Sequence, residues 1–403
     1  MPFAFVLGRE SELSLAELVQ VVNADKIACE PVSGSPSFLV MECAEFSGQH
    51  FSRCGGLIKY GEVQEAAMGA ADRAITDLVM ATAKKAKRLH FGISVYPASP
   101  QVTRKTLAEW QERMNLLGLS IRQNLKAEKT STRFVTSTEP QLSSVVVAKN
   151  KLVTENGLEV LVGVEEKRVW IGRTLAVQDF EAFAHRDMGR PSRDDVSGML
   201  PPKLARTMLN LAGISINKAA VVLDPFCGSG TIAQEALLLG AGKVLASDAS
   251  DKAVADAQVN IDWLMKQQVL TGECRFEQVD AGELHRWLPE NFVDLIATEP
   301  FLGDPVRGRL SRDGVIKRQA DLSQLYERAL TSMAKVLKPD GRLVIIFPVL
   351  EEHRVPFPPA MGRFFQVVEP WKQFFVANSK RGGLDYQRPG QRVGREIFVL
   401  KKK

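Results

Sequence analysis

The sequence of 403 residues lacks the features that mark membrane and secreted proteins. It contains no run of about eighteen apolar residues, the length that a membrane-spanning helix needs. Its first residues, Met1 to Ala4, lack the charged start and the cleavage site of a signal peptide. These absences predict a cytoplasmic protein that does not enter a membrane.

Cysteine and histidine are scarce, with five residues of each type. The cysteines are odd in number and form no C-x-x-C pair, which argues against a disulfide framework and against a zinc site. The histidines are isolated from one another. The sequence therefore predicts no disulfide framework and no bound metal.

The net charge of +5 is modest, but basic residues are concentrated in one part of the chain. Between residues 84 and 133, eleven basic side chains stand against three acidic ones. This excess suits contacts to phosphate groups, and a solvated helix face is the alternative. The residues predicted to bind RNA are Lys84, Lys85, Lys87, Arg88, Arg104 and Lys105, together with Arg307 and Arg309 in a later loop.

The order of the expected helices and strands divides the chain into four segments. Residues 1–60 are interpreted as a small α+β module, in which Ser14 and Glu17 have the spacing of a helix capping box. Residues 61–177 are interpreted as a second α+β unit. Residues 178–200 are rich in charge, Gly and Pro and are interpreted as a linker. Residues 201–403 alternate strands with helices, which predicts a right-handed, mostly parallel sheet.

Within these segments the residue patterns predict individual elements. Helices are expected at residues 12–22, 66–81, 103–117, 203–211, 253–265 and 322–337. Strands are expected at residues 3–7, 37–42, 91–96, 145–148, 158–164, 168–172, 219–223, 243–247, 275–279, 293–298, 342–347, 365–376 and 395–400.

The strand at residues 219–223 is followed by the motif Asp-Pro-Phe-Cys-Gly-Ser-Gly-Thr at residues 224–231. Gly228 and Gly230 lie in the turn between this strand and a helix, where glycine permits positive φ and the helix offers free N–H groups to a ligand. The motif lacks both the G-x-G-x-x-G order of dinucleotide-binding proteins and the lysine of a P-loop. It resembles motif I of class I S-adenosylmethionine (SAM) methyltransferases. A structural turn or a site for another nucleotide is the alternative.

A second motif, Thr298-Glu299-Pro300-Phe301, follows the strand at residues 293–298. The carboxyl ends of parallel strands form the ligand crevice, so this loop is expected to face the same cleft as Gly228. Amino methylases of nucleic acids place Asp/Asn-Pro-Pro-Tyr/Phe here, where a polar group accepts amino protons and the aromatic ring stacks on the base. Thr298 takes the polar place, Phe301 takes the aromatic place, and Glu299 is expected to supply the missing carboxylate.

Over nearly its full length the chain resembles the THUMP-containing RNA methyltransferases that make N2-methylguanosine in tRNA. The segments that carry the resemblance are residues 5–9 with 13–17, 91–94, 172–174 with 177–179, 186–187 with 190–191, 198–205, 224–231, and 386–388 with 391–393. The resemblance implies an α/β fold class, with a Rossmann-like class I methyltransferase domain at residues 201–403. It also implies N-terminal α+β domains that bind RNA: a ferredoxin-like domain at residues 1–60 and a THUMP domain at residues 61–177.

The same resemblance implies SAM as the cofactor and methyl transfer to the N2 amino group of a guanosine in tRNA, typically at position 10. Carried over by motif, the cofactor-binding residues are Asp224, Phe226, Gly228, Gly230, Thr231, Asp248 and Asp280. The catalytic residues are Thr298, Glu299, Pro300 and Phe301. We expect a monomer, and some members of the group need a small activating partner.

Two other functions remain open at this point. One is an amino-group methyltransferase that acts on rRNA or another RNA. The other is a non-catalytic RNA-binding protein that keeps the SAM fold, because the Thr-Glu-Pro-Phe motif departs from the usual pattern.

Overall fold

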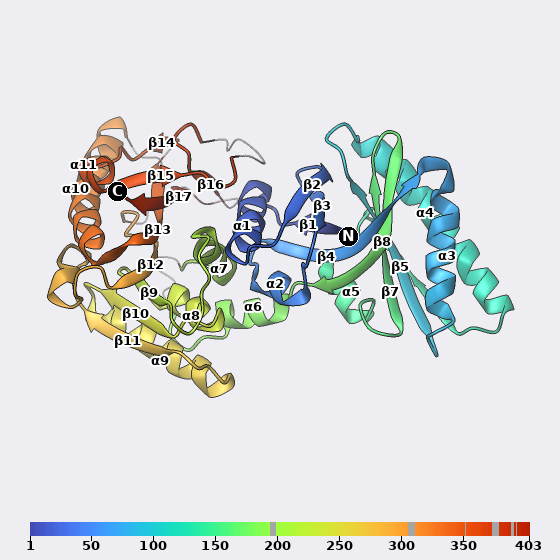
Figure 1. The fold of residues 1–403 in the computed structure, drawn as a ribbon, viewed down its shortest axis with the longest axis horizontal. Helices are drawn as coiled ribbons and strands as arrows, with labels where there is room; N and C mark the ends of the chain where they lie inside the picture. Colours follow the sequence, from blue (N-terminus) through green and yellow to red (C-terminus); the bar gives the residue numbers. More distant parts are fainter. Residues whose placement is uncertain (194–198, 305–310, 351, 373–378, 388–390, 392) are drawn as a thin grey trace. The chain divides into compact units, whose positions relative to one another are not determined.

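The computed structural model describes residues 1–193, 199–304, 311–350, 352–372, 379–387, 391 and 393–403. The chain forms two compact units (Figure 1). The first, N-terminal unit consists of Met1–Ser14, Lys26–Ser52 and Gly56–Phe180, and the second, C-terminal unit consists of Leu15–Asp25, Arg53–Gly55 and Glu181–Lys403. Among the described residues, no helix is both long and apolar enough to cross a membrane.

The described part of the N-terminal unit is built on one sheet with the strand order β2-β3-β1-β4-β8-β7-β5-β6. Its strands are β1 (Pro2–Leu7), β2 (Cys29–Gly34), β3 (Phe38–Cys43), β4 (Leu57–Ala67), β5 (Leu89–Pro97), β6 (Thr132–Val135), β7 (Gly157–Val164) and β8 (Arg168–Val177). Its helices are α2 (Gly48–Arg53), η1 (Met68–Ala70), α3 (Ala71–Ala83), α4 (Arg104–Ala127) and α5 (Ser144–Lys149).

Strand β4 joins the two halves of this sheet, because it pairs antiparallel with β1 on one side and with β8 on the other. The predicted boundary between residues 60 and 61 lies inside β4. The assignments of residues 1–60 as a ferredoxin-like domain and of residues 61–177 as a THUMP domain stay predictions.

A buried ion pair lies in the middle of this sheet. Lys59 on β4 and Glu159 on β7 are almost completely buried, and Nζ lies 2.5 Å from Oε1. The hydroxyls of Ser94 and Thr174 each donate to the Glu159 carboxylate at 2.6 Å. A buried ion pair of this kind is tolerated because its polar atoms have partners.

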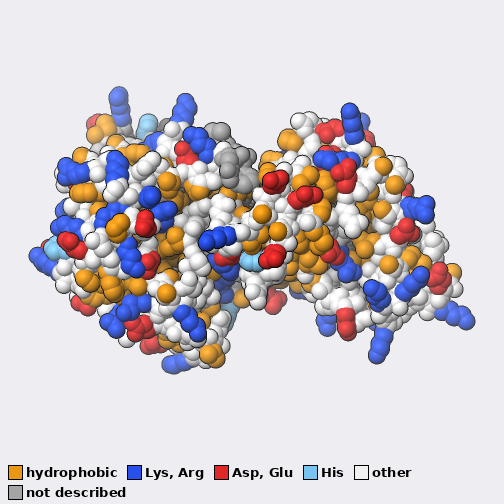
Figure 2. Space-filling model, viewed as in Figure 1, with side chains coloured by type: hydrophobic (Ala, Val, Ile, Leu, Met, Phe, Trp, Pro, Cys, Tyr) orange, Lys and Arg blue, Asp and Glu red, His pale blue; other side chains and the backbone are white. Residues whose placement is uncertain are grey.

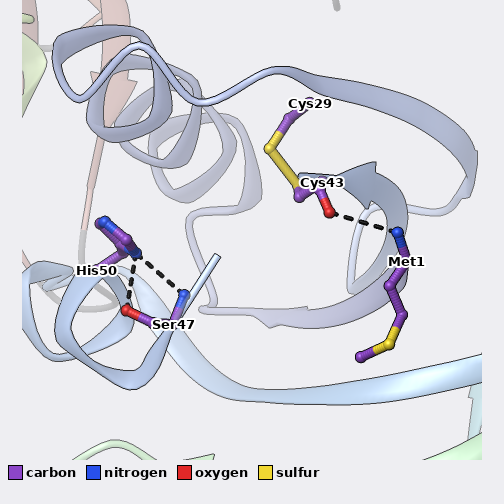
Figure 3. Close-up of a disulfide and its surroundings, with 5 residues drawn as sticks. All are labelled: Met1, Cys29, Cys43, Ser47 and His50. Atoms are coloured by element: carbon purple, nitrogen blue, oxygen red, sulfur yellow. Dashed lines mark hydrogen bonds between the residues drawn. A yellow bond between two sulfur atoms is a disulfide. The ribbon is translucent and has the colours of Figure 1, made fainter. Parts of the chain in front are cut away.

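Cys29 and Cys43 form a disulfide (Figure 3), so the prediction of no disulfide is wrong for this pair. The two residues are direct partners in the antiparallel pairing of β2 with β3, and their Cα atoms lie 4.2 Å apart. The amino group of Met1 donates to the carbonyl oxygen of Cys43 (3.4 Å). An odd cysteine count does not reveal which strands pair, and strand pairing is what brings these two side chains together.

The C-terminal unit contains a sheet with the described order β11-β10-β9-β12-β13-β17-β15, in which β14 pairs with β13 and β16 with β17. Its strands are β9 (Val221–Asp224), β10 (Lys243–Asp248), β11 (Glu273–Gln278), β12 (Val293–Thr298), β13 (Leu337–Leu350), β14 (His353–Arg354), β15 (Phe365–Val368), β16 (Leu384–Tyr386) and β17 (Val393–Lys402). Its helices are α6 (Phe180–Met188), α7 (Pro202–Leu211), α8 (Thr231–Leu238), α9 (Asp251–Gln267), η2 (Ala281–Arg286), α10 (Arg312–Val336) and α11 (Pro359–Phe364), of which α6 begins at the last residue of the first unit.

Strands β11, β10, β9, β12 and β13 run parallel, as the sequence predicts. Strand β17 pairs antiparallel with β13, and β15 pairs antiparallel with β17. The chain places β10 and β11 on one side of β9 and β12 on the other side. The strand order therefore reverses between β9 and β12. In open α/β sheets, ligands bind at the carboxyl ends of the strands beside such a reversal.

Helix α1 (Ser11–Ala24) belongs to the C-terminal unit from Leu15 onward. Glu17 does not close a capping box, because the helix already begins at Ser11. Its Oε1 instead accepts hydrogen bonds from the side chain of Asn210 and from the backbone N–H of Gly55, both at 2.7 Å. The capping-box spacing of Ser14 and Glu17 therefore does not correspond to a capping box, and Glu17 instead holds α1 against α7.

Other sequence predictions fail where tertiary packing overrides the local pattern. Residues 145–148 were expected as a strand, but they lie in helix α5, whose N-cap Ser143 accepts a hydrogen bond from the N–H of Val146. The expected linker at residues 178–200 contains helix α6. The strand expected at residues 365–376 ends at Val368, and residues 373–378 lie outside the described residues.

Candidate active site

The loop between β9 and α8 has the form that its glycines predict. Gly228 and Gly230 adopt left-handed backbone conformations with φ of +48° and +84°. A Cβ atom on Gly230 would lie 3.1 Å from Cβ of Ala257, whereas a Cβ on Gly228 would meet no atom within 4 Å. Gly230 is therefore needed for close packing, and Gly228 leaves open space beside the start of α8.

Asp248, at the end of β10, lies against this loop. One carboxylate oxygen accepts the N–H of Gly228 (3.1 Å) and the other accepts the N–H of Ser250 (3.0 Å). These bonds fix the Asp248 side chain at the edge of the sheet where the parallel strands have their carboxyl ends. Each of its two oxygens keeps a lone pair for another donor. The arrangement suits the hydroxyl groups of a ribose.

Asp224, at the end of β9, is buried. Burial raises the pKa of its carboxyl from 3.8 to about 7, although hydrogen bonds from Thr298 and from the N–H of Phe226 act in the opposite direction. The Thr298 hydroxyl donates to Oδ1 of Asp224 at 2.8 Å. Strands β9 and β12 are thus linked at the point where the strand order reverses.

Asp280 follows β11 at the same edge of the sheet and begins the 3-10 helix η2. Its Oδ1 accepts the N–H of Gly282 at 2.8 Å. Asp224, Asp248 and Asp280 therefore lie at the carboxyl ends of three adjacent strands, as the sequence predicts. Their roles in cofactor binding stay predictions.

The predicted catalytic residues in the loop after β12 differ in burial and in hydrogen-bond partners. Thr298 is completely buried, and its hydroxyl is engaged with Asp224. Glu299 accepts a hydrogen bond from Nε of Arg395 at 2.5 Å. Pro300 is buried, while the Phe301 ring is 50% exposed and is available to stack. Of the two polar side chains, only Glu299 is partly exposed, at 14%.

Cys227 lies inside the first loop and has the character of a packing residue. Its side chain is buried, and burial raises the pKa of its thiol well above the usual value. A thiol that stays protonated is a poor nucleophile. Cys227 is therefore not expected to react with a substrate.

Sequence reasoning missed the residues that support the first loop from the segment after α6. Nη1 of Arg190 donates to Oγ1 of Thr231 at 2.6 Å, and the guanidinium is completely buried. The Asn260 amide donates to the carbonyl oxygens of Ser192 (2.8 Å) and Ser229 (2.9 Å). The signals in the sequence were the charge of Arg190 in a segment interpreted as a linker and the place of residues 190–191 among the segments that carry the resemblance.

A second buried cluster joins α6, α7 and α8. The Glu235 carboxylate, on the helix that follows the first loop, pairs with Arg186 and with Arg206, each at 2.6 Å. The guanidinium groups of both arginines also lie about 5 Å from the centre of the Phe183 ring, at 4.6 and 5.0 Å. These contacts hold α8, and with it the loop, in a fixed place.

The predicted RNA-binding residues of the N-terminal unit lie at two different edges of its sheet. Strands β5, β6 and β7 run parallel, so the segments that precede them share one edge. Exposed basic residues in those segments form what we call the basic edge: Lys84, Lys85, Lys87, Arg88, Lys126, Lys129, Lys149 and Lys151.

Arg104 and Lys105 do not belong to the basic edge, because they come after β5 and lie at the opposite edge of the sheet. Lys126 and Lys129, from the same basic stretch of the sequence, also belong to it, and so do Lys149 and Lys151, which lie outside that stretch. Figure 2 shows Lys and Arg side chains projecting from the margin of the N-terminal unit. Arg307 and Arg309 lie outside the described residues.

In the described part of the chain, no three His, Cys, Asp or Glu side chains form a group that could hold a metal ion. The polar groups at the carboxyl edge of the sheet are instead single carboxylates on neighbouring strands. Such groups suit an organic ligand with several hydroxyl and amino groups.

The sheet order and the two loops define a Rossmann-like methyltransferase domain, which confirms the fold class predicted for the C-terminal unit. Residues 190–355 match the family model described as UPF0020: RMKL-like, methyltransferase domain. Over these residues the chain is therefore similar to the methyltransferase domain of this family.

Two curated relatives are similar to this chain over part of its length. One is a tRNA (guanine(10)-N2)-dimethyltransferase of Methanocaldococcus jannaschii, 27% identical over 218 residues, which cover 52% of this chain and 56% of the relative. The other is a tRNA (guanine(6)-N2)-methyltransferase of Thermus thermophilus, 34% identical over 181 residues, which cover 43% of this chain and 47% of the relative. The matches span about half the length of these relatives.

A solved structure is similar to the whole chain. The crystal structure of TrmN from Thermus thermophilus aligns with 100% of this chain and 100% of its own chain, with a TM-score of 0.56 and 19% sequence identity. At this identity the likeness concerns the fold alone.

Proposed function

We propose that the protein is a cytoplasmic enzyme that transfers a methyl group from SAM to the N2 amino group of a guanosine in tRNA. Position 10 is the first candidate, since that position stands in the name of one curated relative, and position 6 stands in the name of the other. The observation that carries the proposal is the meeting of two loops where the strand order reverses: the Gly228 loop bound to Asp248, and the Glu299 loop after β12.

The residues of the first loop fit SAM. The open space beside Gly228 gives room for a ligand next to the helix N-terminus, where Thr231 begins α8. The fixed carboxylate of Asp248 would accept the ribose hydroxyls, and Asp280 would accept from the adenine amino group. The bound cofactor would supply an activated methyl group, and these residues would hold its position.

The second loop fits a purine amino group. The guanine N2 atom is a weak nucleophile because its lone pair is delocalised into the ring. Bound SAM would supply an electrophilic methyl group, and N2 would give up one proton to an acceptor such as the Glu299 carboxylate when it takes that methyl group. A carboxylate that accepts the amino N–H bonds favours methylation, and Glu299 would be this acceptor. The exposed ring of Phe301 would stack on the base.

The basic edge of the N-terminal unit fits the phosphate backbone of the substrate. Eight exposed cations at one edge of a sheet provide sequence-independent contacts to an RNA, and their contribution falls with rising salt. The tRNA would be held mainly through its backbone, while the Glu299 loop would select the base.

The test is methyl transfer from labelled SAM to an unmodified tRNA pool, followed by nucleoside analysis and mapping of the product. We expect N2-methylguanosine, with mapping to position 10 or to position 6 as the further result. Phe301→Ala should lower turnover because the base loses its stacking partner. Phe357→Ala is a matched control, since Phe357 is also partly exposed in this unit but packs on Phe347 and Phe398.

The alternatives predict other results. A product on rRNA but not on tRNA would assign the enzyme to another RNA. SAM binding without turnover on either RNA would favour a non-catalytic RNA-binding protein, a reading that the pairing of Glu299 with Arg395 keeps open.

A further inference from the structure

The loop after β12 is held at three points by three different elements. The Thr298 hydroxyl binds Asp224 on β9 at 2.8 Å. The carbonyl oxygen of Phe301 accepts a hydrogen bond from the buried hydroxyl of Tyr326 on α10, also at 2.8 Å. Between these two points, Glu299 is held by Arg395 on β17. The backbone on both sides of Glu299 is thus fixed, and Arg395 decides where its carboxylate lies.

Arg395 is itself oriented before it reaches Glu299. Only 9% of its side chain is exposed, and its Nη1 donates to Oε1 of Gln391 at 3.0 Å. Its Nε donates to Oε1 of Glu299 at 2.5 Å. A guanidinium fixed at two nitrogens has one orientation, so the carboxylate it binds also loses most of its rotational freedom.

Only one of the two carboxylate oxygens of Glu299 is used in this pair. Among the residues that the structure describes, no hydrogen bond reaches the other oxygen, Oε2. The Glu299 side chain is 14% exposed, so the carboxylate is neither sealed in the core nor free in solvent. This is the geometry of an acceptor with one fixed oxygen and one available oxygen.

We propose that Arg395, oriented by Gln391, is a positioning residue that holds Glu299 with Oε2 turned toward the amino group to be methylated. This inference rests on the proposed function. Glutamate is one methylene longer than aspartate and has one more rotatable bond. A glutamate that accepts the amino N–H bonds therefore gains more than an aspartate would from being held in one conformation. The ion pair thus compensates for the unusual motif: Glu299 accepts the amino N–H bonds, and Arg395 never touches the substrate.

The competing explanation is that the ion pair only ties β17 to the loop and stabilises the fold. The two explanations differ in which kinetic constant changes. Loss of a positioning contact lowers kcat and leaves the KM for tRNA and the dissociation constant of SAM nearly unchanged. Loss of a purely structural contact lowers the melting temperature and the fraction of active enzyme, and it leaves kcat per active enzyme nearly unchanged.

The experiment compares the wild type with Arg395→Gln, Arg395→Lys, Glu299→Gln and the double variant Glu299→Gln/Arg395→Gln. We expect Arg395→Gln to lower kcat about 10-fold to 100-fold, part of the range that acid–base groups contribute. KM for tRNA should change less than about threefold. Arg395→Lys should recover part of kcat, because lysine restores a cation that can bind Oε1.

The double variant tests whether Arg395 acts through Glu299. If Arg395 acts through Glu299, the double variant is no slower than Glu299→Gln alone, because the acceptor is already lost. Asp385→Asn is the matched control. It removes the negative charge by which Asp385, on the neighbouring strand β16, pairs with Arg354 at 2.8 Å. This variant should leave kcat unchanged.

Three results would overturn the inference. Arg395→Gln with wild-type kcat would show that Glu299 needs no positioning. Additive losses in the double variant would show that Arg395 acts independently of Glu299. A wild-type enzyme that binds SAM but transfers no methyl group to any RNA would remove the proposed function and the inference with it, and this result is distinct from the first two.

Discussion

At the scale of single residues, the chemistry of the site depends on carboxylates in unequal environments. Asp224 is buried and hydrogen-bonded, Asp248 is fixed by two backbone N–H groups, and Glu299 is paired with an arginine. The same functional group therefore has three different environments, which are set by burial and by hydrogen-bond partners and not by the residue type alone.

Asp224 should make the stability of the protein depend on pH. Burial raises its pKa from 3.8 to about 7 in the folded state, so between these values the folded chain keeps a proton that the unfolded chain has released. The free energy of unfolding therefore falls as pH rises from about 4 to about 7, by an amount on the order of a few kcal/mol. Asp224→Asn, which keeps an acceptor for Thr298, should remove this slope.

Urea unfolding at a series of pH values, compared between the wild type and Asp224→Asn, measures the effect. Asp256→Asn is a control, because Asp256 pairs with exposed Lys252 on the surface of α9. Parallel curves for the wild type and Asp224→Asn would contradict the prediction.

Asp248→Ala should weaken SAM binding. The variant removes an acceptor for the ribose and also leaves the N–H groups of Gly228 and Ser250 without their partner. A hydrogen bond to a charged group contributes about 1.5–3 kcal/mol, so we expect a loss of roughly 10-fold to 100-fold in affinity. Titration calorimetry with SAM measures it, with Asp256→Ala as the control. An unchanged dissociation constant would exclude Asp248 from the cofactor site.

At the scale of elements, helix α6 shows why a segment rich in charge was taken for a linker. Glu181 and His185 on this helix are exposed, but Arg186 is buried and pairs with Glu235 on α8, in the same cluster as Arg206. Charge in a sequence predicts exposure, but a charge whose partner lies far along the chain can be buried.

Glu235→Gln should destabilise the C-terminal unit strongly. The substitution leaves two nearly buried guanidinium groups without their shared counter-charge, and breaking a buried pair in this way costs about 3–5 kcal/mol. Denaturant unfolding measures the loss. The control Asp256→Asn removes only an exposed i,i+4 pair and should change stability by less than about 0.5 kcal/mol. A loss as small as that of the control would show that the cluster is not a source of stability.

At the scale of the whole molecule, the proposed binding of RNA and the proposed chemistry on the base belong to separate units. The basic edge belongs to the N-terminal unit, and the two loops belong to the C-terminal unit. Changes to one function should therefore leave the other measurable.

Replacing Lys84, Lys85, Lys87 and Arg88 together by Gln should weaken tRNA binding and reduce its salt dependence. Each lost phosphate contact lowers the slope of log K against log salt by up to about one, so the variant should lose up to about four. SAM binding should stay unchanged. The double variant Arg104→Gln/Lys105→Gln, at the opposite edge of the sheet, is the matched control. A larger effect from this pair than from the four would place the RNA on the other edge.

The sequence by itself determined most of the C-terminal unit. The alternation of apolar strands and helices predicted the parallel sheet, and the glycines at residues 228 and 230 predicted the turn with left-handed backbone, because these features depend on neighbouring residues. The acidic residues at the strand ends were predicted for the same reason.

Only the tertiary structure decided which distant residues meet. The disulfide between Cys29 and Cys43, the attachment of Glu17 to Asn210, the burial of Thr298 and the pairing of Glu299 with Arg395 all join segments whose separation in the sequence carries no signal. The division of the basic residues between two edges of one sheet likewise depends on strand direction. Such contacts arise from packing, whose energy depends on the whole fold and not on any local pattern.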